Sequence, residues 1–358
     1  MKVLIINSVC NGSTGHIAQD IARDFISKGD ECVIAYGRGN PPKQIKSYKI
    51  GNNLSVYWHV LITRLFDKHG FGSKYATKKF VKFIKDYNPD LIWLHNIHGY
   101  YINIKILFNY LRDSCKKVKW TLHDCWAFTG HCPHFEYIKC SKWKKECSNC
   151  PNKKKYPSSF FLDNSKRNFF KKKQIFNSLE NDNLQLIVPS QWLEKLVKES
   201  FLNKYSVQVV NNTINLDVFK PVTSNIKEKY GIIEKKIILG VSSVWNDSKG
   251  LKDFIELSYK ISDDFIIVLI GLNDKQIRVL PKKILGIKRT ENQHELIEWY
   301  SVAFCFFDPT YEDNYPTVLL EANACGCTTI SYDTGGCREI SKYIVNDINE
   351  FLDKIKML

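Results

Sequence analysis

The sequence predicts an α/β fold with two domains, each built around a parallel sheet. Its 358 residues correspond to about two domains of roughly 150 residues each. Short β-branched apolar runs alternate with helical segments along the chain, as in a parallel sheet wound with helices. Residues 1–190 hold 31 Lys and Arg against 14 Asp and Glu, whereas residues 191–358 hold 21 against 23. The first half is therefore expected to meet an anionic partner.

Apolar runs and the periodic segments between them place the individual elements. In the first half they predict strands at 2–7, 31–36, 90–95, 117–122, 184–189 and 206–210, and helices at 15–27, 74–86, 103–113 and 162–179. In the second half they predict strands at 236–242, 265–270, 303–308 and 328–332, and helices at 251–260, 292–302, 316–324 and 346–356.

Two similar α/β domains that face one another bind ligands outside the carboxyl ends of their strands. We expect a first domain at 1–210 and a second at 225–358, joined by a polar hinge at 211–224. The first domain is expected to carry a cysteine-rich insert at about 124–160. The two domains are thus predicted to be Rossmann-like and to face a central cleft.

Composition excludes several classes of protein. Hydrophobic residues make up 44% and charged residues 25%, which argues against a disordered chain, a collagen or a disulfide knot. The opening residues lack the pattern of a signal peptide, and no apolar run approaches the ~18–20 residues of a membrane-spanning helix. We expect a soluble, cytoplasmic protein whose 12 cysteines are free thiols or metal ligands.

The candidate residues of the first half follow its strands. The loop 8–15, SVCNGSTG, contains Gly12 and Gly15 and leads into a helix, where small residues let a phosphate approach the backbone. Turn geometry alone also explains such a loop. His123 ends a strand, where it either points into the cleft and contacts a sugar hydroxyl or simply caps the strand. His95 and His98 follow the neighbouring strand, and shape the wall or touch substrate.

In the second half, Lys249 follows a strand and could neutralise a diphosphate, although surface lysines are common. Asp313 and Glu321 frame the start of a helix whose first turn includes Thr317 and Val318. Free N–H groups of this helix can bind an oxyanion, and Glu321 can accept two hydrogen bonds from a ribose diol. The alternative is a capped helix, but a carboxylate within the apolar stretch around Glu321 needs a partner.

In this order and spacing, the motifs resemble those of a known family. They are NGSTGHI, LHNIHGYY, TLHDCWAFTGHCPHF, the cysteine cluster, VPSQWL, SKG, EDNYPTVLLEANACG and DTGG. From residue 1 to about residue 340, the chain resembles a family 4 glycosyltransferase of the GT-B fold, of the capsule and exopolysaccharide branch that carries a cysteine-rich insert.

The resemblance implies a role for each matching residue. Asp313 and Glu321 match the ends of the family's E-x7-E motif, which implies that Asp313 lies by the donor sugar and that Glu321 holds the nucleotide ribose. Lys249 matches the lysine that contacts the diphosphate, and His123 the histidine beside the transferred sugar. Gly12 to Gly15 match the loop that closes over the phosphates.

The chain also departs from the family pattern. Ser243 replaces the arginine that usually partners the lysine, and Asp313 stands where Glu is usual. The loop 286–289, which ends at Arg289, would decide between uracil and guanine, and family membership favours a UDP-sugar.

Four cysteines of the insert, with the spacing C-x7-C-x6-C-x2-C, suit a structural zinc ion held by thiolates. Free thiols packed in the insert are the main alternative. The four are Cys132, Cys140, Cys147 and Cys150.

A basic tract at 153–173 interleaves lysines with phenylalanines. One interpretation is a solvated helix face, and the other is contact with anionic lipid headgroups. The second interpretation predicts a peripheral protein on the inner face of the plasma membrane, where it would meet a lipid-linked acceptor.

Together these features predict a retaining glycosyltransferase of bacterial surface polysaccharide synthesis, with no cofactor for catalysis, a nucleotide-sugar donor and a glycan or lipid-linked acceptor. Ser243 favours a second hypothesis, a GT-B scaffold that has lost activity. A third hypothesis, a zinc-containing basic nucleic-acid-binding protein, leaves Asp313 and Glu321 unexplained, so no nucleic-acid partner is expected.

Overall fold

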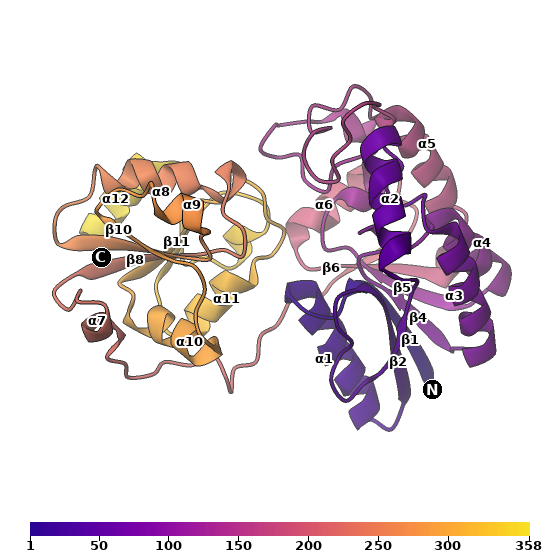
Figure 1. The fold of residues 1–358 in the computed structure, drawn as a ribbon, viewed down its shortest axis with the longest axis horizontal. Coiled ribbons are helices and arrows are strands. Elements are labelled where there is room, and N and C mark those ends of the chain that lie inside the picture. The colour runs from indigo at the N-terminus through magenta and orange to yellow at the C-terminus, as the bar shows by residue number, and fades with distance from the viewer. The chain divides into compact units, whose positions relative to one another are not determined.

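The computed structural model describes residues 1–358, which divide into two compact units, Met1–Asn211 and Asn212–Leu358. Each unit contains one sheet in which all paired strands are parallel. Helices cover both faces of each sheet (Figure 1). The predicted α/β class with two parallel sheets is therefore confirmed.

The sheet of unit 1 has the strand order β3-β2-β1-β4-β5-β6-β7. On one face α1 packs against apolar residues of β1 and β2, and on the other α3 and α4 complete the larger core. The elements are β1 (Lys2–Val9), α1 (Ser13–Ser27), β2 (Glu31–Arg38), β3 (Lys46–Lys49), α2 (Asn53–Phe66), α3 (Lys74–Tyr87), β4 (Leu91–Leu94), α4 (Ile104–Ser114), β5 (Lys117–Thr121), α5 (Ser165–Phe176), β6 (Leu184–Val188), α6 (Gln191–Glu199) and β7 (Ser206–Val209).

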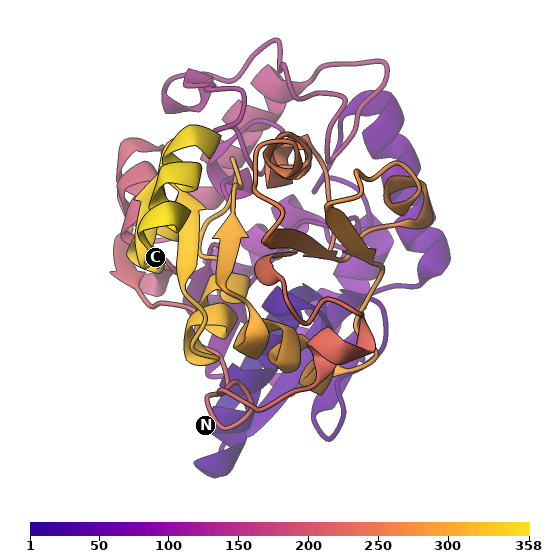
Figure 2. The ribbon, with the colours of Figure 1, turned by 90° about the vertical axis from the view of Figure 1, so that its left-hand side faces the viewer.

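The sheet of unit 2 has the order β10-β9-β8-β11-β12-β13. One face packs against α10 and α11, and the other against α8 and the C-terminal helix α12, shown in yellow in Figure 2. The elements are α7 (Ile226–Lys229), β8 (Lys236–Val241), α8 (Leu251–Ser258), β9 (Phe265–Ile270), α9 (Asp274–Ile277), β10 (Ile284–Ile287), α10 (Gln293–Val302), β11 (Cys305–Asp308), α11 (Thr317–Ala324), β12 (Thr329–Tyr332), β13 (Tyr343–Val345) and α12 (Ile348–Met357).

Both sheets are wound in the same way. The first strand of each unit lies in the interior, the next two strands add on one side, and the chain then returns to the other side. The winding direction therefore changes between β1 and β4 in unit 1, and between β8 and β11 in unit 2. In open parallel sheets, loops at the carboxyl ends of the strands that flank this point form the ligand site.

Several elements were not expected from the sequence. The structure adds the short strands β3, β10 and β13 and the helices α2, α6, α7 and α9. The expected helix at 162–179 is shorter, because α5 covers Ser165–Phe176. Helix α2 begins where the Asn52 side chain accepts a hydrogen bond from the Ser55 N–H, and it ends at Asp67 in the left-handed conformation. No helix has the length and apolar character needed to cross a membrane.

Candidate functional site

The candidate site of unit 2 lies at the β8–β11 switch point. Lys249 belongs to a short turn after β8, and its backbone N–H donates a 3.0 Å hydrogen bond to the Asn246 side chain. The next residue, Gly250, has φ +72°, and a Cβ there would lie 2.5 Å from the carbonyl oxygen of Pro309. A glycine is therefore required where the loop after β8 meets the loop after β11.

This close packing brings Lys249 against the acidic residues of the second loop. Its Nζ donates to Oδ2 of Asp313 at 2.5 Å and to the carbonyl oxygen of Glu312 at 3.3 Å. Burial alone would lower the pKa of Lys249, but the charges of Asp313 and Asp308 outweigh it and raise the pKa above its usual value. Lys249 is therefore protonated, and Asp313 already balances part of its charge.

Asp308, the last residue of β11, was not singled out from the sequence. Burial raises its pKa to about 7, and the nearby Asp313 adds to the shift, although Lys249 works against it. Near neutral pH, the group of Lys249, Asp313 and Asp308 therefore changes its net charge by one unit. The signal in the sequence that could have identified Asp308 was its position at the carboxyl end of a strand next to the switch point.

Glu321 lies on the second turn of α11, eight residues after Asp313. The hydroxyl of the buried Tyr300 donates a 3.0 Å hydrogen bond to its Oε2. Burial raises the pKa of Glu321 to about 7, although hydrogen bonds with Tyr300 and Thr317 oppose the rise. The partner that the sequence analysis required for this carboxylate is thus Tyr300 of α10, together with Thr317.

The remaining predicted donor residues of unit 2 occupy different places. Ser243 follows β8 and Arg289 follows β10, and both side chains are exposed. Val318 is half-buried and packs against the core beneath α11. The structure thus gathers Lys249 with the acidic loop, and Glu321 with Thr317.

In unit 1, the predicted glycine loop connects β1 to α1. Gly12 precedes the helix with φ +79°, and a Cβ there would meet nothing within 4 Å. A Cβ on Gly15 would lie 2.4 Å from both the carbonyl carbon and the oxygen of Cys10. Close packing of the loop therefore explains Gly15, whereas open space surrounds the position of Gly12.

His123 follows β5 and pairs with His95, which follows β4. Nε2 of His123 lies 2.9 Å from Nδ1 of His95, and the two rings stack with centroids 5.2 Å apart. Burial lowers the pKa of His123 to about 4, so the imidazole is neutral at pH 7. The two histidines line one small pocket at this edge, and His123 can exchange hydrogen bonds with a ligand but carries no charge there.

A second pair in this pocket was not predicted. Nε2 of His98 lies 2.9 Å from Oδ2 of Asp124, and its Nδ1 lies 3.3 Å from the hydroxyl of Tyr156 in the insert. Burial alone would raise the pKa of Asp124, but the charge of His98 and their hydrogen bond lower it to about 2. The sequence signal was an aspartate directly after His123, at a strand end.

The structure does not support the four-cysteine zinc site. The four predicted cysteines line one small pocket together with Trp143 and Phe135, but no three potential ligands anywhere in the chain are grouped so that they could hold a metal ion. A hydrogen bond with the Cys132 thiol lowers the pKa of Cys150 to about 7. Zinc therefore stays a prediction from the sequence alone, and metal analysis of the purified protein would decide it.

The basic tract 153–173 is not one solvated face. Lys172 is buried, with 1% of its surface exposed, and its Nζ donates to the carbonyl oxygens of Trp126 at 2.8 Å and Thr129 at 3.0 Å. Lys171 and Lys173 are exposed. Lys172 therefore cannot contact a lipid surface, because helical periodicity turns this lysine of α5 toward the core.

Comparison with known proteins identifies the second unit. Residues 222–349, which include Lys249, Asp308, Asp313 and Glu321, match the family Glycosyl transferases group 1. Unit 2 is a group 1 domain. The matched residues thus include every donor-site residue predicted for unit 2, whereas the residues predicted for unit 1 lie outside the match.

The whole chain is similar to other proteins at low identity. It is 22% identical over 362 residues to WcaC of Escherichia coli (strain K12), which is named as a colanic acid biosynthesis glycosyl transferase, covering 95% of this chain and 85% of that protein. Among solved structures, sucrose-phosphate synthase from Thermosynechococcus elongatus matches with a TM-score of 0.69 and 14% identity, covering 99% of this chain and 89% of that one. HepE from Anabaena, solved with UDP-glucose, has a TM-score of 0.65 and 13% identity, covering 100% and 89%. The chain with its group 1 domain therefore has the GT-B fold.

Proposed function

We propose that the chain is a retaining, metal-independent glycosyltransferase that takes its sugar from a nucleotide-sugar, with UDP as the nucleotide. The observation that carries the proposal is the placement of Lys249 beside Asp313 at the switch point of the group 1 domain. Because a diphosphate is negatively charged, it requires a neutral or positive group at the carboxyl end of the sheet, where ligands bind in such folds. The UDP-glucose bound to HepE supports the choice of donor.

In this proposal the main task of the protein is to stabilise the leaving diphosphate. The bond that breaks joins the anomeric carbon of the sugar to the diphosphate, and Lys249 and the N-terminus of α11 meet the charge that develops. Glu321, when ionised, accepts hydrogen bonds from the ribose hydroxyls. His123, neutral at pH 7, hydrogen-bonds the transferred sugar. No protein nucleophile is required.

We place the acceptor on unit 1 and propose a glycan or lipid-linked saccharide of a bacterial surface polysaccharide. The relationship to WcaC supports this substrate class. The protein would then work as a peripheral protein on the inner face of the plasma membrane. The excess of Lys and Arg over Asp and Glu in residues 1–190 is consistent with an anionic acceptor or surface.

Thermal unfolding of the purified protein with UDP, GDP, ADP and their sugars tests the donor, because a ligand that binds only the native state raises the Tm. We expect the largest shift with UDP and a UDP-sugar. Transfer of labelled sugar in the presence of EDTA tests metal independence, and the anomeric configuration of the product, read by NMR, tests retention. Binding without transfer to any acceptor would favour the inactive-scaffold hypothesis, and no shift with any nucleotide would overturn the proposal.

A further inference from the structure

Helix α2 of unit 1 presents its apolar face to solvent and its polar face to the core. His59 and Thr63 are fully buried, and ring nitrogen Nδ1 of His59 lies 2.9 Å from Oγ of Ser73. On the opposite side, apolar residues recur at the spacing of one helix face and are largely exposed: Leu54 by 76%, Tyr57 by 71%, Trp58 by 62% and Leu61 by 45%. A helix that packs only on its own protein has the reverse pattern.

A segment of the insert extends this apolar face. The N–H of Phe160 donates a 2.8 Å hydrogen bond to the carbonyl oxygen of Arg64 in α2, and the Arg64 guanidinium lies 5.9 Å from the centroid of the Phe160 ring. Together the helix and this segment form what we call the α2 surface, an exposed group made of Leu54, Tyr57, Trp58, Leu61, Phe66, Phe160, Phe161 and Leu162.

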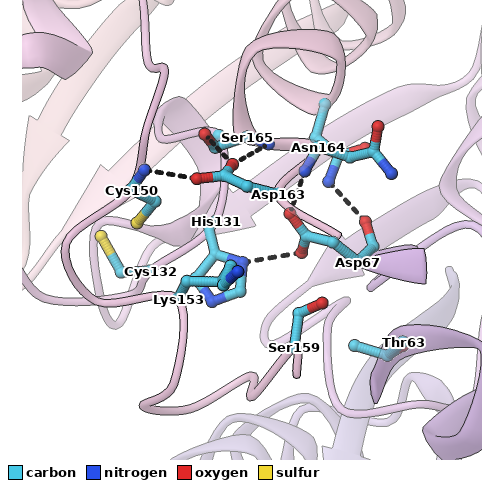
Figure 3. Close-up of polar contacts among 12 residues, drawn as sticks. Thr63, Asp67, His131, Cys132, Cys150, Lys153, Ser159, Asp163, Asn164 and Ser165 are labelled. Atoms are coloured by element: carbon cyan, nitrogen blue, oxygen red, sulfur yellow. Dashed lines mark hydrogen bonds and ion pairs between the residues drawn. The ribbon is translucent and has the colours of Figure 1, made fainter. Parts of the chain in front are cut away.

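Polar contacts centred on the buried Asp67 hold the two parts of the α2 surface together (Figure 3). Asp67, the residue after α2, accepts a 2.9 Å hydrogen bond from the N–H of Asn164 and contacts Nδ1 of His131 at 2.7 Å. The Asn164 side chain donates to the carbonyl oxygen of Phe66 at 2.8 Å. The helix and residues 160–162 are therefore fixed to each other, and the α2 surface is a preformed platform.

Cations gather beside the α2 surface. The Nζ of Lys68 lies 5.3 Å from the centroid of the Phe66 ring. The Nζ of Lys171 lies 5.7 Å from the centroid of the Phe71 ring, in the segment that follows α2, and burial together with the charges of neighbouring cations lowers the pKa of Lys171. This basic cluster, in which no member forms an ion pair, consists of Lys68, Lys74, Lys105, Arg167 and Lys171.

We propose that the α2 surface docks on an anionic lipid bilayer, with Trp58 and its apolar neighbours entering the interfacial region and the basic cluster meeting the headgroups. Exposed apolar patches of this extent mark interaction sites, and Trp and Tyr favour the membrane–water boundary. The proposal deepens the proposed function, because a lipid-linked acceptor would be met at such a bilayer.

Charge distinguishes a bilayer from a second copy of the chain. A symmetric dimer through the α2 surface would bring two basic clusters close together, and their repulsion would oppose association. An anionic bilayer instead supplies opposite charge to the same cluster and an apolar layer to the aromatic side chains. We therefore assign the surface to lipid and treat the dimer as an outcome of the test.

The test is co-sedimentation of the full chain with vesicles of neutral lipid alone or with 30% phosphatidylglycerol, without donor or acceptor. We expect binding to the anionic vesicles and at least tenfold weaker partitioning for the variant Trp58→Gln/Leu61→Gln. The matched control is Tyr259→Gln/Val279→Gln, which alters two apolar residues of unit 2 that are even more exposed than Trp58 and Leu61, and it should bind as wild type. The Tm of each variant checks that it is folded.

A second variant separates charge from apolar insertion. Changing Lys68, Lys74, Arg167 and Lys171 to Gln should remove the salt-sensitive part of binding, whereas the Trp58 variant should lose the part that persists at high salt. Equal binding by wild type and the Trp58 variant, or no binding at low salt, would overturn the proposal. So would a wild-type dimer, seen by analytical ultracentrifugation, that the Trp58 variant dissociates. Vesicle binding without any nucleotide binding would instead refute the proposed function and leave the docking surface intact.

Discussion

Nζ of Lys249 lies 2.5 Å from Oδ2 of Asp313, so the cation of the proposed donor site is already partly neutralised by its neighbour. We expect Lys249→Met to weaken UDP binding about tenfold or more, because a charge-assisted hydrogen bond contributes ~1.5–3 kcal/mol. Lys252→Met, which removes an exposed lysine three residues later, is the control. Calorimetry with UDP measures both.

The ion pair of Lys249 and Asp313 leads to the opposite expectation for a change at Asp313. Asp313→Asn leaves Lys249 without its counter-charge, so UDP affinity should be equal to or higher than that of wild type, while transfer of the sugar falls. Loss of UDP binding to the extent seen for Lys249→Met would mean that the pair acts by shaping the loop and not by its charge.

Glu321→Ala should lower nucleotide affinity by roughly 10- to 100-fold, since one or two hydrogen bonds from a ribose diol to a carboxylate are lost. Glu256→Ala, an acid on the exposed side of α8, should bind nucleotide as wild type does. Unchanged calorimetric binding by a folded Glu321 variant would remove this residue from the site.

Nucleotide binding should depend on pH in a bell-shaped manner with its maximum near neutrality. Burial raises the pKa of both Asp308 and Glu321 to about 7. Ionisation of Glu321 as pH rises improves its acceptance of ribose hydrogen bonds, whereas ionisation of Asp308 adds a negative charge beside the diphosphate. In titrations from pH 5.5 to 8.5, the nucleotide affinity of Asp308→Asn should only rise with pH. The affinity of Glu321→Gln should only fall with pH. A flat profile in wild type contradicts this.

His123→Ala should leave nucleotide affinity unchanged and lower the rate of transfer, because we place the imidazole at the sugar. His294→Ala, which removes an exposed histidine of α10, is the control. Since the pKa of His123 is about 4, its contribution should not change between pH 6 and 8. Turnover at the wild-type rate in the variant would rule out the assignment.

Because of Lys172, the free energy of unfolding should depend on pH above neutrality. Burial lowers its pKa from 10.5 to about 7, so between these values the unfolded chain binds a proton that the folded protein does not. The free energy of unfolding contributed by this residue therefore falls as pH drops from about 10 to about 7, and levels off below. In urea unfolding, Lys172→Met should lack this slope, so it gains stability relative to wild type toward pH 7. Parallel profiles for the two proteins would show that Lys172 is charged in the folded state.

The sequence predicted the long central strands well, because their buried β-branched runs are readable without tertiary context. Strands β3, β10 and β13 were missed, since each has only three or four residues and lies in the outer part of its sheet. Helix α2 was missed for a different reason. Its exposed side is apolar, whereas its buried side carries His59 and Thr63, which is the reverse of the pattern by which a surface helix is recognised in a sequence.

For the candidate site, the strand ends pointed to Lys249, Asp313, Glu321 and His123, and the resemblance supplied their roles. The ion pair of Lys249 with Asp313 joins residues 64 positions apart, and the burial that shifts Asp308 is a property of the packed loops. Neither can be inferred from local sequence. Lys172 shows the same limit, because two exposed lysines flank it and only the packing of α5 distinguishes it.

The contacts of Asp67 impose an order on events at the ribosome. Its carboxylate and carbonyl are satisfied by His131, Asn164 and Asn168, which follow it by 64, 97 and 101 residues. As translation proceeds, Gly70, Gly72 and Ser73 can reach the buried side of α2 early, whereas the contacts of Asp67 are completed only after about a hundred further residues have been added. Throughout that interval the apolar side of α2 is exposed without the segment 160–162 that adjoins it in the finished protein, so this stretch is where a chaperone or the bilayer itself would engage the growing chain.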